Sequence, residues 1–186
     1  MSMLHAPTYR WTVEEYEELG RAGFFQGDKR VELFNGEIIA MSPIGFRHAT
    51  AVRLLNNFFA ERARHRFEVD PQNPFVLDNL SEPQPDLTLL DPAVSKARRH
   101  PRPADLFLVI EVSDSTVPYD REDKGPAYAR NGVCEYWLLN LDACVLEVYR
   151  EPSPNGYGQT QSFGPDETAA PQAFPDLVIR VGDFLP

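Results

Sequence analysis

Gln84-Pro85-Asp86 opens the stretch that decides the fold, and Asp120-Arg121-Glu122-Asp123-Lys124 closes it. Between them, Leu106-Phe107-Leu108-Val109-Ile110 places five apolar residues in a row, and Glu111 follows directly. Such a run predicts a strand that is covered on both faces of a sheet. A carboxylate at the end of a buried strand is costly unless its charge is compensated. A divalent metal shared with Asp86, which precedes a shorter apolar run, is one such compensation.

The order acid, strand, acid and then lysine is the pattern that metal-dependent phosphodiester cleavage needs. Taken separately, each residue has another interpretation: Asp86 as a strand cap, Glu111 as a salt-bridged core acid, and Lys124 as an exposed helix lysine or a partner of Asp120. Because the two acids come as a pair beside apolar strands, we favour metal binding for them. Asp120 itself is expected to be the N-cap of a helix.

Composition indicates a globular protein. The chain has 186 residues, of which 42% are hydrophobic and 25% charged, enough for one domain over residues 1–186. No apolar run approaches the ~20 residues of a membrane span. The stretch Met1–Arg10 lacks the apolar core of a signal peptide, so we expect a cytoplasmic protein. We expect Cys134 and Cys144 to be reduced core thiols rather than a disulfide or a zinc site.

The charge distribution leaves the question of partners open. A net charge of −10 argues against strong non-specific nucleic-acid binding. Positive charge nevertheless gathers in residues 47–66 and in residues 96–102. These two basic clusters could contact phosphates, or they could be the solvated faces of a helix and a loop.

Periodicity and turn signals predict a mixture of helices and strands. The expected elements are a helix capped by Thr12 and ended by Gly20 or Gly23, a hairpin over 31–41 with a type I′ turn at Asn35-Gly36, a helix over 48–64, strands at 67–77 and 86–90, a helix over 120–130, a strand pair at 135–140 and 144–149, a loop or irregular hairpin after Arg150, and a last strand at 177–181. Gly125-Pro126 either kinks its helix or starts the first turn of one. At the start of its own helix, His48 is expected to be a capping or core residue.

In these blocks the sequence resembles the Uma family of putative endonucleases, whose fold is of the restriction-endonuclease-like PD-(D/E)XK type. The matching blocks are Val31–Glu37, His48, Gln84–Asp86, Ile110–Ser113, Ser115-Thr116, Asp120–Lys124, Tyr128–Arg130, Gly132-Val133 and Glu135–Trp137. The resemblance implies an α/β (α+β) fold: a mixed central sheet flanked by helices, with additional antiparallel hairpins. It also implies a Mg²⁺ site at one edge of that sheet.

The resemblance assigns roles to particular residues. It implies Asp86 and Glu111 as metal ligands, together with the backbone carbonyl of Val112. Ser113 stands where the usual pattern has a lysine, so the resemblance points to Lys124 on the next helix as the replacement. Glu32 corresponds to an additional acid from the first strand pair. It could equally be a sheet-face carboxylate paired with Arg30 or Arg53.

The expected function is Mg²⁺-dependent endonucleolytic hydrolysis of nucleic acid, with Mn²⁺ as a substitute and DNA as the expected substrate, although no residue selects DNA over RNA. We expect a homodimer without membrane association. Tyr136 and Trp137 are expected in the core, with an interface as the second interpretation. The alternative function is a non-catalytic binding or assembly module that keeps the nuclease-like fold, which the acidic charge favours. A small-molecule hydrolase lacks support, because the chain has no G-x-S-x-G motif and no Cys-His constellation.

Overall fold

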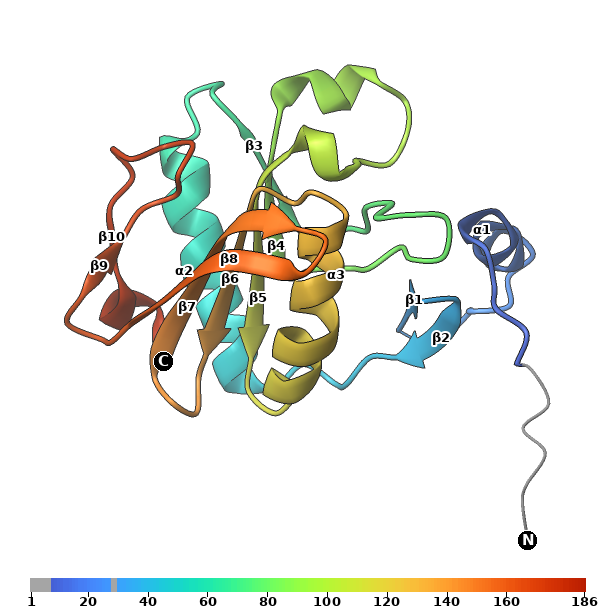
Figure 1. Ribbon diagram of the computed structural model, residues 1–186, viewed down its shortest axis with the longest axis horizontal. Coiled ribbons are helices and arrows are strands. Elements are labelled where there is room, and N and C mark those ends of the chain that lie inside the picture. The colour runs from blue at the N-terminus through green and yellow to red at the C-terminus, as the bar shows by residue number, and fades with distance from the viewer. Residues whose placement is uncertain (1–7, 28–29) are drawn as a thin grey trace, which may run out of the picture.

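The computed structural model describes residues 8–27 and 30–186. Residues 1–7, which make up most of the stretch considered for a signal peptide, lie outside this description. A mixed sheet with the order β3-β4-β5-β6-β7-β8 forms the centre of the molecule (Figure 1). Its strands are β3 (Glu68–Pro71), β4 (Leu87–Leu90), β5 (Leu106–Ser113), β6 (Glu135–Asn140), β7 (Val145–Ser153) and β8 (Gly156–Phe163).

Strands β5 and β6 are parallel, and every other neighbouring pair in this sheet is antiparallel. Parallel neighbours need a crossover connection, which is usually helical. Here the crossover consists of a π-helical turn, η3 (Tyr119–Lys124), and the short helix α3 (Gly125–Arg130). The predicted helix over 120–130 is therefore two segments, and Pro126 lies in the first turn of the second.

Strand β5 is covered on both faces, as predicted. Leu108 and Ile110 pack in one apolar cluster with α2 (Phe46–Arg62), whereas Val109 belongs to a second cluster with α3. Figure 1 shows these two helices on opposite sides of the sheet. Because side chains alternate along a strand, Glu111 lies on the α3 face with Val109. The strand continues to Ser113, so Glu111 lies inside it and not at its end.

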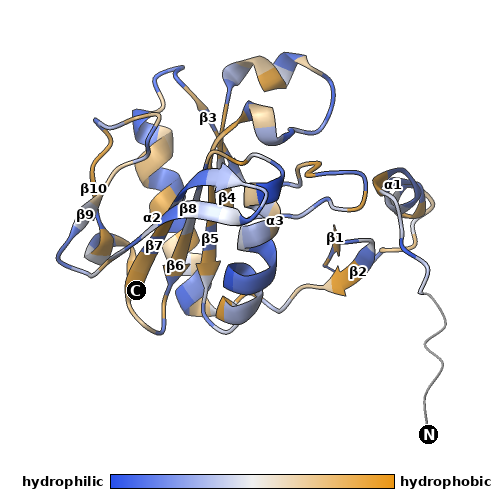
Figure 2. Ribbon diagram, in the orientation of Figure 1, coloured by the Kyte–Doolittle hydropathy of each residue, from blue (hydrophilic) through white to orange (hydrophobic). Residues whose placement is uncertain are grey.

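The structure refines three expectations about strands. Only Glu68–Pro71 of the expected strand at 67–77 is a regular strand. The residues after it stay close to the segment before β4, but through scattered bonds such as Gln72 N to Asp86 O and Phe75 N to Pro83 O. The segment after Arg150, expected as a loop or an irregular hairpin, belongs to the antiparallel hairpin of β7 and β8, so the hairpin alternative is confirmed. Figure 2 shows β8 in pale and blue tones, as befits an edge strand rich in Gly, Gln and Thr. The last strand is only β10 (Ile179–Arg180), which pairs with β9 (Thr168–Ala169).

Helix α1 (Val13–Arg21) begins with the predicted capping box. The Glu15 backbone N–H donates to Thr12 Oγ1 at 3.3 Å, and the Thr12 N–H donates to Glu15 Oε2 at 2.9 Å. The C-cap is Ala22, and Gly23 follows it with a φ of 80° and donates to Gly20 O at 2.9 Å, so one of the two predicted glycines ends the helix. The remaining short elements are the 3₁₀ turns η1 (Pro92–Lys96), η2 (Pro103–Asp105) and η4 (Val181–Phe184).

Strands β1 (Val31–Phe34) and β2 (Glu37–Ala40) form the predicted hairpin. The turn residues Asn35 and Gly36 have φ values of 50° and 75°, as a type I′ turn requires. Gly36 also holds the hairpin in place, because its N–H donates to Leu80 O at 2.7 Å and its carbonyl accepts from Trp11 N at 2.9 Å.

Burial decides two further expectations. Tyr136 and Trp137 are fully enclosed in the core, so neither is available for a subunit interface. Cys134 and Cys144 are free, but both are exposed and lie outside the core, in contrast to the expectation. None of the described helices combines the length and the apolar character needed to cross a membrane.

Gly36→Ala should destabilise the protein more than Gly132→Ala, as measured by urea unfolding. Both glycines have a φ near 80° (75° and 80°), so both substitutions carry the cost of a left-handed alanine, about 1–2 kcal/mol. Only at position 36 would the new Cβ meet another residue, at 2.6 Å from Arg10 Cβ, whereas Gly132 has open space around it. Equal losses for the two variants would contradict this account of the hairpin.

Candidate active site

The ammonium group of Lys124 lies among three carboxylates. Its Nζ is 3.0 Å from Glu111 Oε1, 3.2 Å from Glu32 Oε1 and 3.9 Å from Asp120 Oδ1. These acids come from β5, β1 and η3, so one side chain joins three separate elements. All four side chains are buried. An exposed helix lysine was one interpretation of Lys124 from the sequence, and its burial excludes that interpretation.

The π-helical turn explains how Lys124 reaches the site although Gly125-Pro126 follows it. Within an α-helix, the ring of Pro126 would clash with the carbonyl of Glu122, four residues earlier. The wider turn avoids this, and the Gly125 N–H instead bonds to Asp120 O, five residues back. Asp120 lies within this turn, and its Oδ2 accepts from Thr116 Oγ1 at 2.7 Å. The expected role of Asp120 as a helix N-cap is therefore wrong.

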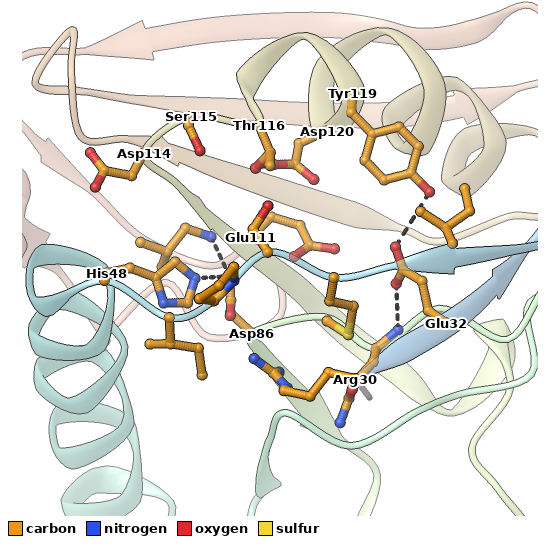
Figure 3. Close-up of a pocket in the computed structure, with 18 of the residues that line it drawn as sticks. Arg30, Glu32, His48, Asp86, Glu111, Asp114, Ser115, Thr116, Tyr119 and Asp120 are labelled. Atoms are coloured by element: carbon orange, nitrogen blue, oxygen red, sulfur yellow. Dashed lines mark hydrogen bonds and ion pairs between the residues drawn. The ribbon is translucent and has the colours of Figure 1, made fainter. Parts of the chain in front are cut away.

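Asp86 lies at the start of β4 with one carboxylate oxygen firmly held. Asp86 Oδ2 accepts from the Val112 N–H at 2.9 Å and lies 3.0 Å from His48 Nε2 (Figure 3). The other oxygen, Oδ1, has a single partner among the described residues, Gln72 Nε2 at 3.4 Å. His48, in the first turn of α2, is thus neither a cap nor a plain core residue: it orients Asp86. Sequence analysis quoted this histidine but gave it no part in the site.

The backbone carbonyl of Val112 faces the same space as Asp86. In a hydrogen-bonded antiparallel pair, the N–H and C=O of one residue point to the same neighbour. The register pairs Leu87 with Ile110, so its continuation would place Pro85 opposite Val112. Proline has no N–H to offer to that carbonyl. The dipeptide Pro85-Asp86 therefore leaves the Val112 carbonyl free as an oxygen ligand.

A pocket of about 220 Å³ contains all the predicted site residues. Its wall includes Glu32, Asp86, Glu111, Val112 and Lys124. Figure 3 shows Asp86, His48 and Glu111 gathered on one part of this wall, with Glu32 and Tyr119 on another. Tyr119 also contributes a hydroxyl, which donates to Glu32 Oε1 at 3.3 Å.

The electrostatics of the pocket follow from burial. Loss of hydration is the main reason why the pKa of Glu111 is raised to about 8; the neighbouring acids also raise it, and the charge of Lys124 opposes them. Burial alone would lower the pKa of Lys124, but the attraction of Glu111, Glu32 and Asp120 outweighs it and keeps the pKa well above its usual value. Burial also raises the pKa of Asp120.

The pocket has the donor set of a site for a hard divalent cation. Both oxygens of Glu32 are engaged, one by Lys124 and Tyr119 and the other by the Gln84 N–H. Glu111 instead receives Lys124 and Tyr128 on Oε1, and no described residue donates to its Oε2. Oxygen atoms of Asp86, Glu111 and the Val112 carbonyl are thus available, and oxygen ligands are what Mg²⁺ prefers. Glu32 is better placed to hold Lys124 than to bind a metal.

Tyr128 is a residue of this site that sequence analysis missed as such. Its hydroxyl donates to Glu111 Oε1 at 2.9 Å. The signal was present in the spacing, because residues four apart on a helix share a face and Tyr128 follows Lys124 by four. The signal is weak, because an aromatic residue near the end of a short helix is more often part of the core.

The profile of the family named Uma2, described as "Putative restriction endonuclease", matches residues 13–182. The chain belongs to the Uma2 family. A solved structure, described as that of a putative nuclease belonging to DUF820 from Anabaena variabilis ATCC 29413, is similar to this Uma2 chain with a TM-score of 0.69. The two sequences are 16% identical, and the match covers 93% of this chain and 96% of that chain. This similarity confirms the expected fold. No curated protein matches the sequence.

Several arginines of the two basic clusters of this Uma2 protein form internal ion pairs. Arg47 contacts Asp114 at 2.9 Å and Asp142 at 3.0 Å, and Arg66 contacts Asp176 at 2.9 Å. Arg99 contacts Asp105 at 2.6 Å. Arg47, Arg66 and Arg99, which could have contacted phosphates, thus form ion pairs within the protein.

The metal-free protein should become less stable as the pH rises from 4.5 to about 8, because Glu111 titrates at 4.5 when unfolded and at about 8 when folded. Between these values the folded state holds a proton that the unfolded state has released, so the free energy of unfolding falls with pH. Glu111→Gln should flatten this slope by an amount on the order of a few kcal/mol across the window. The measurement is urea unfolding at several pH values, with the exposed Glu122→Gln as control. An unchanged slope in Glu111→Gln would contradict the assignment.

Proposed function

We propose that this Uma2 protein is a metal-dependent endonuclease that hydrolyses phosphodiester bonds of nucleic acid, with DNA as its substrate. The observation that carries the proposal is the pocket in which Asp86, Glu111 and the buried Lys124 meet. Membership of the Uma2 family supports the same conclusion. We further propose that it acts in the cytoplasm and as a two-fold homodimer, because two active sites are needed to cut both strands of a duplex.

Asp86, Glu111 and the Val112 carbonyl would hold Mg²⁺, for which Mn²⁺ would substitute. When bound, the ion supplies Lewis acidity: it makes water a stronger nucleophile and offsets charge on the phosphate oxygens. The carboxylates of the pocket outnumber its two cationic side chains, since Glu32, Asp86, Glu111, Asp114 and Asp120 line it together with Arg30 and Lys124. This excess of negative charge favours a divalent cation.

The remaining residues act on orientation and charge. Lys124 keeps its proton and places a positive charge beside Glu111, where it can stabilise charge that develops on the phosphate. Glu32 and Tyr128 fix that ammonium and the Glu111 carboxylate in position. His48 holds Asp86 Oδ2, which would leave Oδ1 as the oxygen able to bind the cation.

A second candidate function is a non-catalytic binding or assembly module with the same fold. The observation that favours it is the net charge of −10 together with the internal pairing of Arg47, Arg66 and Arg99. Such a module would use the pocket, if at all, for a cation without turnover. The two candidates differ in one result, which is cleavage of nucleic acid.

Asp86→Asn should abolish both Mn²⁺ binding at the pocket and cleavage. The amide keeps the shape of the side chain but not its charge, so the hydrogen bond from Val112 survives while the cation loses a ligand. Calorimetric titration with Mn²⁺ and cleavage of duplex and single-stranded DNA measure the two effects. Asp123→Asn, which changes an exposed acid of η3, is the matched control and should behave as the wild type. A wild type that binds Mn²⁺ but cuts no nucleic acid would favour the binding module.

Lys124→Met should reduce cleavage on the order of 10²-fold or more, typical for loss of a charge-stabilising group. Methionine keeps most of the stem but leaves Glu111, Glu32 and Asp120 without their cation, so the free energy of unfolding should fall by about 3–5 kcal/mol. Cleavage is therefore measured at a temperature where circular dichroism shows the variant folded, and with Mn²⁺ binding verified. Cleavage that survives in Lys124→Met but not in Asp86→Asn would remove the lysine from the mechanism and keep the metal.

A further inference from the structure

Glu17, Glu82 and His100 meet on a part of the molecule that the proposed activity does not use. Each offers one ligand atom, and these atoms all lie within 4.8 Å of one another. Among residues 8–27 and 30–186, this is the only group of three or more acidic, histidine or cysteine side chains with that property. The acids of the active-site pocket do not form such a group.

The three side chains come from segments whose backbones are already tied together. Glu17 lies on α1, whose first N–H, that of Val13, donates to Asn79 O at 2.9 Å. His100 lies in the connection 92–103, and Val76 N donates to Pro101 O in that connection at 2.9 Å. Glu82 follows Val76 and Asn79 in the same segment of the chain, and its own N–H donates to Leu33 O at 2.8 Å. The convergence is therefore a property of the fold and not of flexible side chains alone.

Glu82 carries an unsatisfied buried oxygen. The residue is only 4% exposed, and its Oε2 has no hydrogen-bond partner among the described residues. Its other oxygen, Oε1, lies 3.8 Å from His100 Nε2, too far for a hydrogen bond. Burial raises the pKa of this carboxyl, and Glu17 raises it further. A buried carboxylate without partners is costly, and a cation bound by all three side chains removes that cost.

We propose that Glu17, Glu82 and His100 form a second metal site, which binds Zn²⁺. Zn²⁺ accepts carboxylate oxygen and imidazole nitrogen together, whereas Mg²⁺ favours oxygen ligands alone. With Zn–O and Zn–N bonds of about 2.0–2.2 Å, two ligand atoms of a tetrahedral site lie about 3.4 Å apart, so Glu82 Oε1 and His100 Nε2, now 3.8 Å apart, would approach by a few tenths of an ångström on binding. Glu17 now contacts Arg21 at 3.3 Å. To bind the metal, its carboxylate would leave Arg21 and move towards Glu82 and His100.

The site would act on structure and not on chemistry. A Zn²⁺ ion there fastens α1 and the connection 92–103 to the segment that leads into Gln84-Pro85-Asp86. Glu82 precedes Gln84 by two residues, and the Gln84 N–H donates to Glu32 Oε2 at 3.0 Å. The second site is therefore linked to Glu32, the acid that contacts Lys124, through Gln84 and its hydrogen bond.

The test is calorimetric titration of Zn²⁺ into tag-free protein that carries Asp86→Asn, so that the active-site pocket is disabled. One Zn²⁺ should bind per chain. Added His100→Ala or Glu17→Gln should weaken that binding at least tenfold and remove the rise in melting temperature that Zn²⁺ causes. The controls are His65→Ala and Glu18→Gln, which change an exposed histidine and an exposed acid on the same helix as Glu17, and both should retain the site.

The same titration of the unaltered protein in excess Mg²⁺ provides a second measurement that does not depend on any variant folding. Zn²⁺ should still bind, because Mg²⁺ does not compete for a site with an imidazole ligand. The proposal is overturned if no Zn²⁺ binds under either condition. It is equally overturned if the two control variants lose as much Zn²⁺ affinity as His100→Ala and Glu17→Gln. Loss of Zn²⁺ binding in the Asp86→Asn protein, or in the unaltered protein in excess Mg²⁺, would also overturn it.

Discussion

The ammonium group of Lys124, enclosed by Glu111, Glu32 and Asp120, is the contact on which the arrangement of the site depends. A buried charge is tolerated only when it is paired, and removal of one partner from such a group is strongly destabilising. The pairing therefore constrains three elements at once: β5, the β1–β2 hairpin and the π-helical turn η3. A displacement of any one of them would leave a charge without its partner.

The central sheet supplies the rigid part of this arrangement. Parallel pairing of β5 with β6 requires a crossover, and the crossover delivers Lys124 and Tyr128 onto the face that carries Glu111. The hairpin supplies the other part. Gly36 permits the type I′ turn, and Lys124 and Tyr119 of η3 hold Glu32 against the crossover although β1 and β2 form a separate two-stranded sheet.

Acidic side chains outnumber the basic ones in the pocket, although Arg30 and Lys124 both line it. These two cationic groups do not neutralise the surrounding carboxylates, and His48 is engaged with Asp86. Arg47, meanwhile, joins α2 to the turn after β5 and to the turn after β6 through Asp114 and Asp142. The pocket thus keeps an excess of negative charge, while arginines such as Arg47 pair with acids elsewhere. This distribution of charge suits a cation in the pocket.

The sequence by itself determined the elements with strong local signals: the buried strand before Glu111, the capping box of α1 and the Asn35-Gly36 turn. It also determined that Asp86 precedes one strand and that Glu111 belongs to the buried strand beside it, because apolar runs and proline act locally. Only the tertiary structure decided the partners of Lys124, the contact of His48 with Asp86 and the exposure of the two cysteines. These depend on how a π-helical turn directs one side chain and how α2 docks on the sheet. Such long-range packing leaves no periodic signal in the residues themselves.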